Sequence, residues 1–404
     1  MRILLVSEDI PARQLGGLGR HVVRLGNALL GRGHTVTLMG RADIPYDECA
    51  SEVGFNGPFI GGFDWRRVGW KEVTLGVFLP FKRPHIAKRI ARSILARSGE
   101  FDVVHYHGHF PLVGRYIPKT VNFVQTRHDQ GSECIIHTRF RRGQVCHEAD
   151  PRECAACATE RPNLLQRVIS SCAVRQYRRM TADALSRHPT IFVSNFLRQR
   201  FGQIVPGVNQ QYHVVIHNFV DRLSWPASLT PTVGAARPKR IVVVGRIDEA
   251  KGVGAFLAAL HRHSTIGIAV DIVGDGPLRK SLEETWELPT VSFSGWCLPE
   301  EVLQRIASAD VMVVPSIWEE PCGTTILEGL SVGKPVFALA LGGTPELKQY
   351  EQWDGQLALF STMELLVDAL LTAPAYRPVS FPKGDVDVEV VVNRTLAVYR
   401  TKSA

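Results

Sequence analysis

Strand-sized apolar runs alternate with longer amphipathic segments through most of the chain, and glycines separate many of them. Residues 2–7 form the first apolar run, and residues 19–32 have the periodicity of a helix that ends at Gly33. Residues 35–39 form the next apolar run. The start of the chain therefore predicts a βαβ unit, in which a crossover helix joins two parallel strands.

The alternation continues beyond this unit and restarts once. Buried strands are expected at Val103 and at three further apolar runs, and a new series begins at residues 240–245. Residues 223–238 are rich in proline and have no clear period, which is typical of a linker. The three further runs are residues 122–126, 191–194 and 213–217. This organisation predicts two doubly wound α/β domains.

The domain boundaries are expected at the breaks in this pattern. Residues 1–221 are predicted to form a first Rossmann-like domain, with a cysteine-bearing insert at about 130–160. Residues 222–238 would be the linker, and residues 239–385 the second Rossmann-like domain. Residues 386–404 predict a C-terminal helix.

The composition fits a large folded chain. With 404 residues, of which 45% are hydrophobic and 21% charged, the protein can bury more than one core. The apolar start of the chain is followed at once by Glu8 and Asp9, so it predicts neither a signal peptide nor a membrane span. A cytoplasmic protein is expected, with peripheral contact at the inner face of a membrane as a variant of this expectation.

Positive charge is concentrated in the first half of the chain. Residues 1–190 hold 28 Lys and Arg against 17 Asp and Glu, a balance of +11, whereas the whole chain carries +8. A basic domain can face nucleic acid, anionic lipid or a phosphorylated small molecule, and it can also serve solubility alone. The basic residues are not interleaved with stacking aromatic residues, so a nucleic-acid partner is not expected.

Five of the eight cysteines lie between residues 134 and 172. A chain of this size without a secretory signal does not predict a disulfide framework. One tight Cys-x2-Cys pair with two histidines nearby is chemically suited to a structural zinc, but its outer spacing is irregular, and such patterns are more often not metal sites. The zinc candidates are Cys134, Cys146, Cys154 and Cys157, with His137 and His147 nearby.

Residues 82–97 have the pattern of a basic amphipathic helix. Three isoleucines form one apolar row, and basic side chains lie mostly away from it. The favoured interpretation is a row that faces the core with a solvated basic back, and the alternative is a helix that rests on an anionic membrane. The row consists of Ile86, Ile90 and Ile94, and the basic residues are Lys88, Arg89 and Arg92.

Two carboxylates, Glu320 and Glu328, lie eight positions apart where a strand, a loop and a helix follow one another. Residues 310–315 are the expected strand and residues 325–332 the expected helix, so Glu320 falls near the edge of the sheet where α/β proteins bind ligands. Free amides at the helix start can meet a phosphate, which leaves the carboxylates for sugar hydroxyls. These amides belong to Gly323, Thr324 and Thr325. The segment predicts a sugar-nucleotide site.

Two other loops carry chemistry suited to a diphosphate. Gly16, Gly17 and Gly19 follow the first strand and let the backbone approach a phosphate at a helix N-terminus, although a tight turn is the alternative. Arg246 and Lys251 follow the first strand of the second half. Two cations can stabilise a diphosphate leaving group without a metal, whereas their ordinary role in a loop is a solvated face.

Histidines gather at the ends of two predicted strands of the first half. His105, His107 and His109 alternate, and the two-residue period of a strand predicts that all three point to one face. One of them is expected to line the ligand site, although a structural role is the more frequent one for a single histidine. His128 and Asp129 at the end of the next strand are a second candidate pair.

Six segments resemble, in order, motifs of the retaining glycosyltransferases of family four. The most specific is the Glu320-x7-Glu328 pair with the glycine and proline that follow it. Each segment alone is weak evidence, but six in the family's order span nearly the whole chain. The segments are residues 16–19, 102–107, 244–252, 272–277, 291–295 and 310–335.

The resemblance implies the GT-B fold, in which two Rossmann-like domains face each other across a ligand cleft. The first domain would then bind the acceptor and the second the nucleotide sugar. In this fold the C-terminal helix commonly crosses back to the first domain, so residues 386–402 are expected to do so.

The resemblance also implies roles for individual residues. Glu328 would hydrogen-bond the ribose of the nucleotide, and Glu320 would touch the donor sugar near its reacting end. Arg246 and Lys251 would clamp the diphosphate, and Gly17 would lie over the donor phosphates.

For the base, the implied contacts are backbone groups around Gly295 and Leu298. His107 would face the donor or the acceptor, with His105 as the alternative if the register differs. His128 and Asp129 would lie on the acceptor side.

The expected reaction is the transfer of a hexose-type sugar, with retention, from a nucleoside diphosphate to an acceptor hydroxyl. UDP is favoured over GDP, no divalent metal is required, and the acceptor is a glycan, a lipid-linked intermediate or a natural product. Front-side displacement is implied, with Glu320 as a participant and not as a nucleophile. The alternatives are a nucleotide-sugar-binding protein without activity and a GT-B hydrolase or epimerase.

Overall fold

The computed structural model describes residues 1–64, 73–74, 77–78, 82–157, 163–220, 239–263, 267–372 and 387–401. The chain forms two compact units. Unit 1 comprises Met1–Arg139, His147–His217 and Val388–Ala404, and unit 2 comprises Phe140–Cys146 and Asn218–Asp387. The predicted linker at 222–238 lies outside the described residues.

Unit 1 is built on a seven-stranded sheet with the order β11-β10-β7-β6-β1-β2-β3. All neighbouring strands in this sheet are parallel. Both faces of the sheet are covered, which is why its central strands β1, β6 and β7 are buried almost along their whole length and do not alternate between buried and exposed residues. The strands are β1 (Arg2–Val6), β2 (Thr35–Arg41), β3 (Phe59–Phe63), β6 (Val103–His107), β7 (Phe123–Arg127), β10 (Thr190–Phe192) and β11 (His213–Val215).

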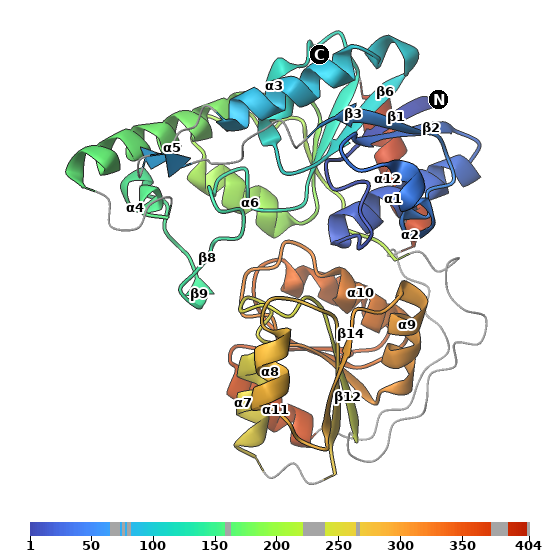
Figure 1. Ribbon diagram of the computed structural model, residues 1–404, viewed down its shortest axis with the longest axis vertical. Helices are drawn as coiled ribbons and strands as arrows, with labels where there is room; N and C mark the ends of the chain where they lie inside the picture. Colours follow the sequence, from blue (N-terminus) through green and yellow to red (C-terminus); the bar gives the residue numbers. More distant parts are fainter. Residues whose placement is uncertain are drawn as a thin grey trace. The chain divides into compact units, whose positions relative to one another are not determined.

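Helices pack on both faces of this sheet (Figure 1). α3 (Lys82–Leu95) and α5 (Leu164–Leu185) share a core with one face, and α1 (Gly17–Gly31) and α12 (Val388–Arg400) lie together on the other. The remaining elements of this part of the chain are short. They are α2 (Ala50–Val53), α4 (Pro151–Ala155), α6 (Asn195–Ile204), β4 (Val73–Thr74) and β5 (Val77–Phe78).

The apolar row of α3 belongs to the core of unit 1. Ile86, Ile90 and Ile94 are each at most 1% exposed and pack in one cluster with Leu4 and Tyr106 of the sheet. The interpretation of this helix as a membrane-resting surface is therefore wrong, because the row is already covered by the protein. The core-facing interpretation is confirmed.

α12 joins the far end of the chain to unit 1. The Arg32 guanidinium donates to the Asn393 side-chain oxygen at 2.6 Å, and Arg394 donates to the Val215 carbonyl at 2.7 Å. Tyr399 is buried, and its hydroxyl lies 2.7 Å from Nδ1 of His105 on β6.

Unit 2 has a six-stranded parallel sheet with the order β14-β13-β12-β15-β16-β17. Figure 1 shows α7, α8 and α11 on one side of this sheet and α9 and α10 on the other. The strands are β12 (Arg240–Val244), β13 (Ala269–Val273), β14 (Val291–Gly295), β15 (Val311–Val314), β16 (Val336–Leu339) and β17 (Leu357–Phe360). The helices are α7 (Val253–His261), α8 (Arg279–Thr285), α9 (Pro299–Ser308), α10 (Thr324–Ser331) and α11 (Met363–Thr372).

The cysteine-bearing insert is divided between the units. Its hairpin of β8 (Phe140–Arg141) and β9 (Gln144–Val145) belongs to unit 2, although the sequence places it within the first domain. None of the helices in the described part of the chain is long and apolar enough to cross a bilayer.

Replacement of Ile90 by Ala tests the position of the α3 row. Ile90 is 1% exposed, so I90A should lower the free energy of unfolding by about 2–5 kcal/mol. Lys88→Ala on the exposed side of the same helix should change it by no more than about 0.5 kcal/mol. The measurement is chemical unfolding of the full chain, and equal effects of I90A and K88A would contradict the core position of the row.

Candidate functional site

Glu320 and Lys251 meet in unit 2 although they are 69 positions apart in the sequence. Lys251 Nζ lies 2.6 Å from Oε1 of Glu320, and the hydroxyl of Ser316 donates to the same oxygen. Glu320 is buried. Burial alone would raise the pKa of Glu320, but the Lys251 charge and these donated hydrogen bonds hold it below the ordinary value. The site therefore contains a buried carboxylate that stays ionised beside an ammonium group.

The loop that carries Lys251 is fixed by a close backbone contact. Gly252 has φ +69°, and a Cβ atom there would lie 2.1 Å from the carbonyl oxygen of Pro315. The amide of Ile317 donates to the carbonyl of Ala250 at 2.9 Å. Only glycine combines this backbone conformation with this approach, so Gly252 holds the loop after β12 against the loop after β15.

The backbone of Glu320 is held from a third loop. The amide of Gly343 donates to the Glu320 carbonyl at 2.7 Å. Gly342 has φ +61°, and a Cβ there would lie 2.5 Å from the same oxygen. Sequence reasoning missed Ser316 and these two glycines. The Gly-Gly pair shortly after an apolar run was the available signal.

α10 starts four residues after Glu320 and carries Glu328. Gly323 precedes its first residue, and the N–H groups of a first helical turn have no partners within the helix. Among the described residues, none accepts a hydrogen bond from the amides of Gly323, Thr324 or Thr325. Glu328 is half-buried and lies within α10. The start of α10 is thus a place where a negatively charged group can be bound.

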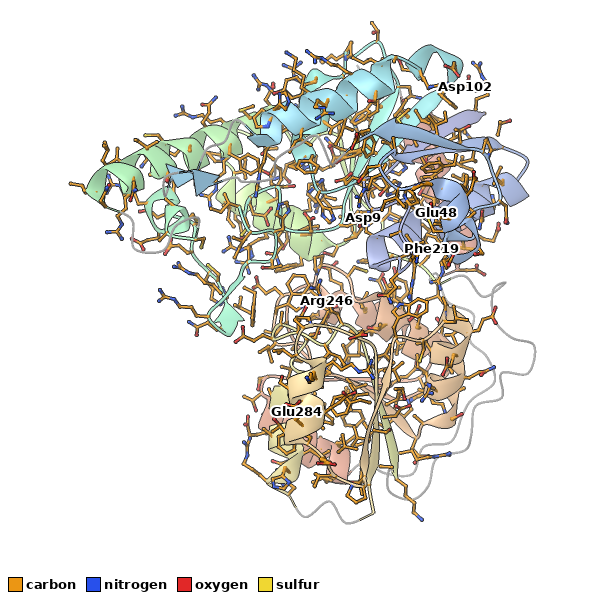
Figure 2. The ribbon with its side chains drawn as sticks, in the orientation of Figure 1. Asp9, Glu48, Asp102, Phe219, Arg246 and Glu284 are labelled. Carbon is orange, nitrogen blue, oxygen red and sulfur yellow. The ribbon has the colours of Figure 1, made fainter. Side chains whose placement is uncertain are left out.

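Arg246 lies in the loop that follows β12 (Figure 2). Its side chain is 69% exposed, and its Nε lies 3.4 Å from Oδ2 of Asp248. Asp248 also accepts from the Lys251 amide at 3.0 Å. Arg246 and Lys251 therefore share the loop and contact the same aspartate, but only Lys251 contacts Glu320.

Gly295 is the last residue of β14, and Leu298 directly precedes α9. Gly295 has φ +72°, and a Cβ there would lie 2.7 Å from a guanidinium nitrogen of Arg279. Leu298 precedes α9 with an exposed side chain. Arg279, which sequence reasoning missed, covers the glycine and is held by Glu283 at 2.8 Å.

The glycine-rich loop of unit 1 leads into α1. Built Cβ atoms on Gly16 and Gly17 would meet nothing within 4 Å, whereas one on Gly19 would lie 2.9 Å from the Leu15 side chain. A side chain at Gly19 would therefore displace the end of the Leu15 side chain, whereas open space lies over Gly17.

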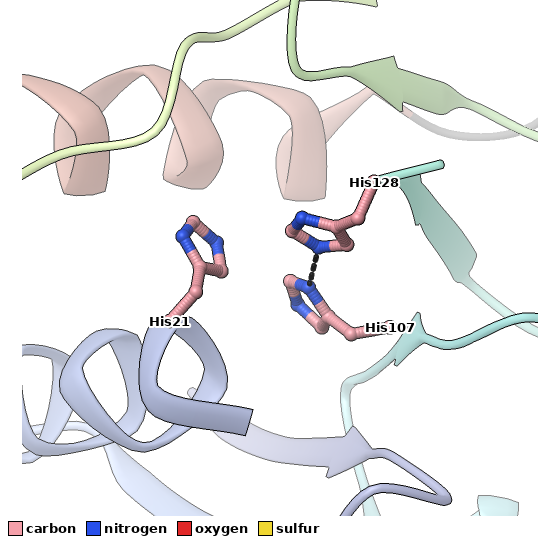
Figure 3. Close-up of side chains that lie close together, drawn as sticks. All are labelled: His21, His107 and His128. Carbon is pink, nitrogen blue, oxygen red and sulfur yellow. Dashed lines mark hydrogen bonds between the residues drawn. The ribbon is translucent and has the colours of Figure 1, made fainter. Parts of the chain in front are cut away.

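Four histidines lie together at one edge of the unit 1 sheet. His107 Nδ1 lies 3.1 Å from His128 Nε2, and His107 Nε2 lies 3.1 Å from His105 Nδ1. The ring of His21, from α1, lies 5.5 Å from that of His107 and 4.9 Å from that of His128 (Figure 3). Burial lowers the pKa of all four imidazoles, to about 3 for His21, so they are uncharged at neutral pH.

His109 does not join this group, and the prediction that three alternating histidines share one face is wrong for it. β6 ends at His107, so the period of the strand no longer applies at His109. Its ring nitrogens lie 2.5 Å from Asp129 and 3.2 Å from Asp9. Burial alone would lower the pKa of His109, but these two carboxylates raise it well above its ordinary value.

Asp129 is the centre of an ionic network. Besides His109, it contacts the Arg127 guanidinium at 3.0 Å and His137 Nδ1 at 3.6 Å. Although burial would raise the pKa of Asp129, its hydrogen bonds and the Arg127 charge hold it well below the ordinary range. Asp129 and His128 are thus adjacent in sequence but belong to a charged and an uncharged cluster, respectively.

Within the described residues of unit 1, Cys134, Cys154 and Cys157 do not form a group of three that could hold one metal ion. Cys146 belongs to unit 2, and the other three belong to unit 1. Burial raises the pKa of the Cys134 thiol to about 11, and Cys154 lies 3.2 Å from the Arg178 guanidinium. In the described part of the chain, groups of three ligating side chains contain histidine and aspartate but no cysteine.

Comparison with known proteins assigns the family. A model described as Glycosyltransferase Family 4 matches residues 15–222, about half of the chain, and one described as Glycosyl transferases group 1 matches residues 238–373. The chain belongs to glycosyltransferase family 4. The resemblance seen in the sequence is therefore confirmed, and the protein is a glycosyltransferase.

Curated relatives match this family 4 chain over most of its length or over a part of it. A glycogen synthase of Mycobacterium tuberculosis is 27% identical over 368 residues, which are 86% of this chain and 80% of the relative. A 2-deoxystreptamine N-acetyl-D-glucosaminyltransferase of Streptomyces fradiae is 35% identical over 120 residues, 28% of each chain.

Solved structures share the fold of this family 4 protein. Anabaena HepE in complex with UDP and glucose has a TM-score of 0.60 at 16% identity and covers 100% of this chain and 96% of its own. Sucrose-phosphate synthase from Thermosynechococcus elongatus has a TM-score of 0.61 at 18% identity and covers 98% and 94%. The predicted GT-B fold is confirmed.

A pair of substitutions tests the coupling of Lys251 to Glu320. Lys251→Met leaves the Glu320 charge without its partner, and the free energy of unfolding at neutral pH should fall by about 3 kcal/mol. Adding Glu320→Gln removes the unpaired charge and should restore part of this loss.

The stabilisation by this ion pair should also depend on pH. Because the folded-state pKa of Glu320 is lowered, the stabilisation is present above the ordinary pKa of 4.5 and is lost as the pH falls through the lowered pKa.

The measurement is chemical unfolding at neutral and acidic pH. Lys348→Met is the matched control, because Lys348 is 48% exposed and lies 4.0 Å from Glu351. A double variant that is no more stable than K251M would show that the two side chains are not coupled.

Proposed function

We propose that the protein transfers a hexose from a UDP-sugar to an acceptor hydroxyl with retention of the anomeric configuration. The observation that carries this proposal is the Lys251–Glu320 pair beside the start of α10. It combines, in one place, a cation and free amides suited to a diphosphate with a buried, ionised carboxylate suited to a sugar.

The departing diphosphate carries the charge that must be stabilised. Lys251 and the amides at the start of α10 contribute positive potential, and the exposed Arg246 extends it along the loop after β12. These groups make a divalent cation unnecessary at the diphosphate. Gly17 of unit 1 has open space above it, which supports a role over the donor phosphates.

Glu320 is proposed to contact the donor sugar near its reacting end. Its low pKa keeps it anionic, so it can stabilise positive charge that develops on the sugar ring. The leaving phosphate oxygen takes the proton of the acceptor hydroxyl as the new glycosidic bond forms on the same face. Glu328 then serves the ribose hydroxyls, and the loop with Gly295 and Leu298 serves the base.

UDP is the proposed nucleotide because solved structures with this fold contain UDP, UDP with glucose and UDP-glucose. The catalytic domain of a starch synthase with the same fold is bound to ADP, so ADP-sugars are the main competitor.

The proposed acceptor is a glycan or a lipid-linked sugar bound by unit 1. His128 and Asp129 lie at one edge of its sheet, are partly exposed and offer polar contacts for sugar hydroxyls, whereas His107 is buried and contacts His128. The charge balance of +11 over residues 1–190 favours an acceptor that carries phosphate. Peripheral membrane contact, if the acceptor is lipid-linked, has support in the exposed apolar side chains at the start of α5, which are Leu164, Leu165, Val168 and Ile169.

A donor panel tests the proposal. Purified protein is incubated with UDP-, ADP-, GDP- and dTDP-sugars, and nucleotide release is measured with and without oligosaccharide acceptors. Release from a UDP-sugar should fall on the order of 10²-fold in Glu320→Gln and in Lys251→Met. Release from ADP-sugars alone would show that the donor nucleotide is ADP and not UDP. Nucleotide release that is unchanged in both variants would contradict the assignment of Glu320 and Lys251 to the donor site.

Arg246→Ala should lower the rate of nucleotide release from the sugar donor, whereas Arg262→Ala should leave this rate unchanged. Arg262 is a suitable control because it is also exposed, at 58%, and pairs with Glu364 at the surface of the same unit. An NMR assignment of the anomeric configuration in the product tests retention. A product with the opposite configuration to the donor would exclude the front-side mechanism.

A further inference from the structure

His21, His107 and His128 surround one point from three different elements of unit 1 (Figure 3). Each offers a ring nitrogen, and these three atoms all lie within 4.8 Å of one another. His107 Nδ1 and His128 Nε2 are 3.1 Å apart. Two nitrogens bound to one tetrahedral zinc at 2.0–2.1 Å are separated by about 3.4 Å, so this pair already has nearly the spacing of two ligands of one ion.

The fold explains why the three rings converge. β7, β6 and β1 are neighbours in the sheet and run parallel, so the segments that follow them emerge at the same edge. His107 ends β6, His128 follows β7, and His21 lies in the first turns of the helix that follows β1. The strand order therefore places three separated histidines around one point on well-packed elements.

The chemistry of the group suits a metal ion better than a proton. A metal binds the lone pair of a neutral imidazole. The three rings are packed against one another, and a charge on one ring disfavours a charge on the next. The cluster itself contains no carboxylate, so its three candidate ligand atoms are all imidazole nitrogens.

His107 also has the kind of outer contact that orients metal ligands. Its second nitrogen, Nε2, lies 3.1 Å from Nδ1 of His105, and Nε2 of His105 lies 2.7 Å from the Thr126 hydroxyl. Such contacts fix the orientation of a ligating ring and the position of its proton. His105 thus acts as a positioning residue in the group.

A second group, His109, Asp129 and His137, has similar spacing but different chemistry. Its members form the ionic network around Asp129, in which His109 bridges two aspartates and Arg127 adds a positive charge. A protonated imidazole has no lone pair for a metal, and the guanidinium repels a cation. This group is therefore a salt-bridge network.

We propose that His21, His107 and His128 form a binding site for a transition-metal ion of the zinc class, with three imidazole ligands and one open coordination position. The site differs from any diphosphate-bound metal because its ligands are imidazoles and not oxygen atoms. One of its ligands, His128, is also proposed for the acceptor side of the transferase site. On the assumption of the proposed transferase function, added Zn²⁺ therefore inhibits transfer.

The test uses tag-free, full-length protein that has been treated with a chelator and then titrated with Co²⁺. One ion per chain should bind, with the strong visible absorption of four-coordinate Co²⁺ and without the near-ultraviolet charge transfer of thiolate ligands. Zn²⁺ should displace it. His21→Phe and His128→Phe, which keep ring size but remove a ligand, should each weaken binding by at least about 10–100-fold, the cost of losing even an outer contact.

Two controls make the result specific. His137→Phe changes the neighbouring ionic group and should leave Co²⁺ affinity unchanged. Circular dichroism of the metal-free variants checks that they fold, and Zn²⁺ should raise the Tm of the original protein but not that of H21F or H128F.

The proposal is overturned if no Co²⁺ binds, if thiolate bands dominate, or if H137F loses binding while H21F keeps it. These outcomes are read without sugar donor or acceptor, so they do not depend on transfer. Loss of nucleotide release in the donor panel with intact Co²⁺ binding would overturn only the transferase proposal.

Discussion

The buried charge of Glu320 constrains much of unit 2. A carboxylate at this depth requires a compensating charge, and Lys251 supplies it at 2.6 Å. Lys251 reaches it only because Gly252 lets two loops approach within a distance that no side chain permits. The Gly342–Gly343 turn then closes on the Glu320 carbonyl from the next strand. Three loops from one sheet edge are therefore fixed by a single ion pair and the glycines around it.

At the corresponding edge of the unit 1 sheet, the main feature is a group of histidine residues without charge. This unit holds an uncharged imidazole cluster next to a charged network, and the boundary between them falls between His128 and Asp129. The separation depends on where β6 ends. His107 still follows the strand and faces His128, whereas His109, two residues later, has left the strand and pairs with Asp129. His107 and His109 thus differ in charge because the backbone brings them to different partners, neutral histidines in one case and two carboxylates in the other.

Much of the fold was predictable because buried parallel strands are apolar runs. The expected strands at residues 2–7, 240–245 and 310–315 correspond to β1, β12 and β15. β3 was not predicted, because Phe59–Phe63 contains two adjacent glycines that weaken the apolar pattern of a strand. The division of the cysteine-bearing insert was also invisible, because a short hairpin carries no signal for the unit against which it packs.

In the candidate site, too, some residues could be predicted from the sequence and others could not. Glu320, Lys251 and the start of α10 were recognisable because each follows a strand within a short motif. The partners that complete the arrangement were not recognisable, because contact between loops depends on strand order, which local periodicity does not encode. His21 illustrates this most clearly, since only the adjacency of β1 and β6 brings it to His107. In a parallel sheet, a motif identifies the edge at which chemistry occurs, and the order of the strands decides which residues meet there.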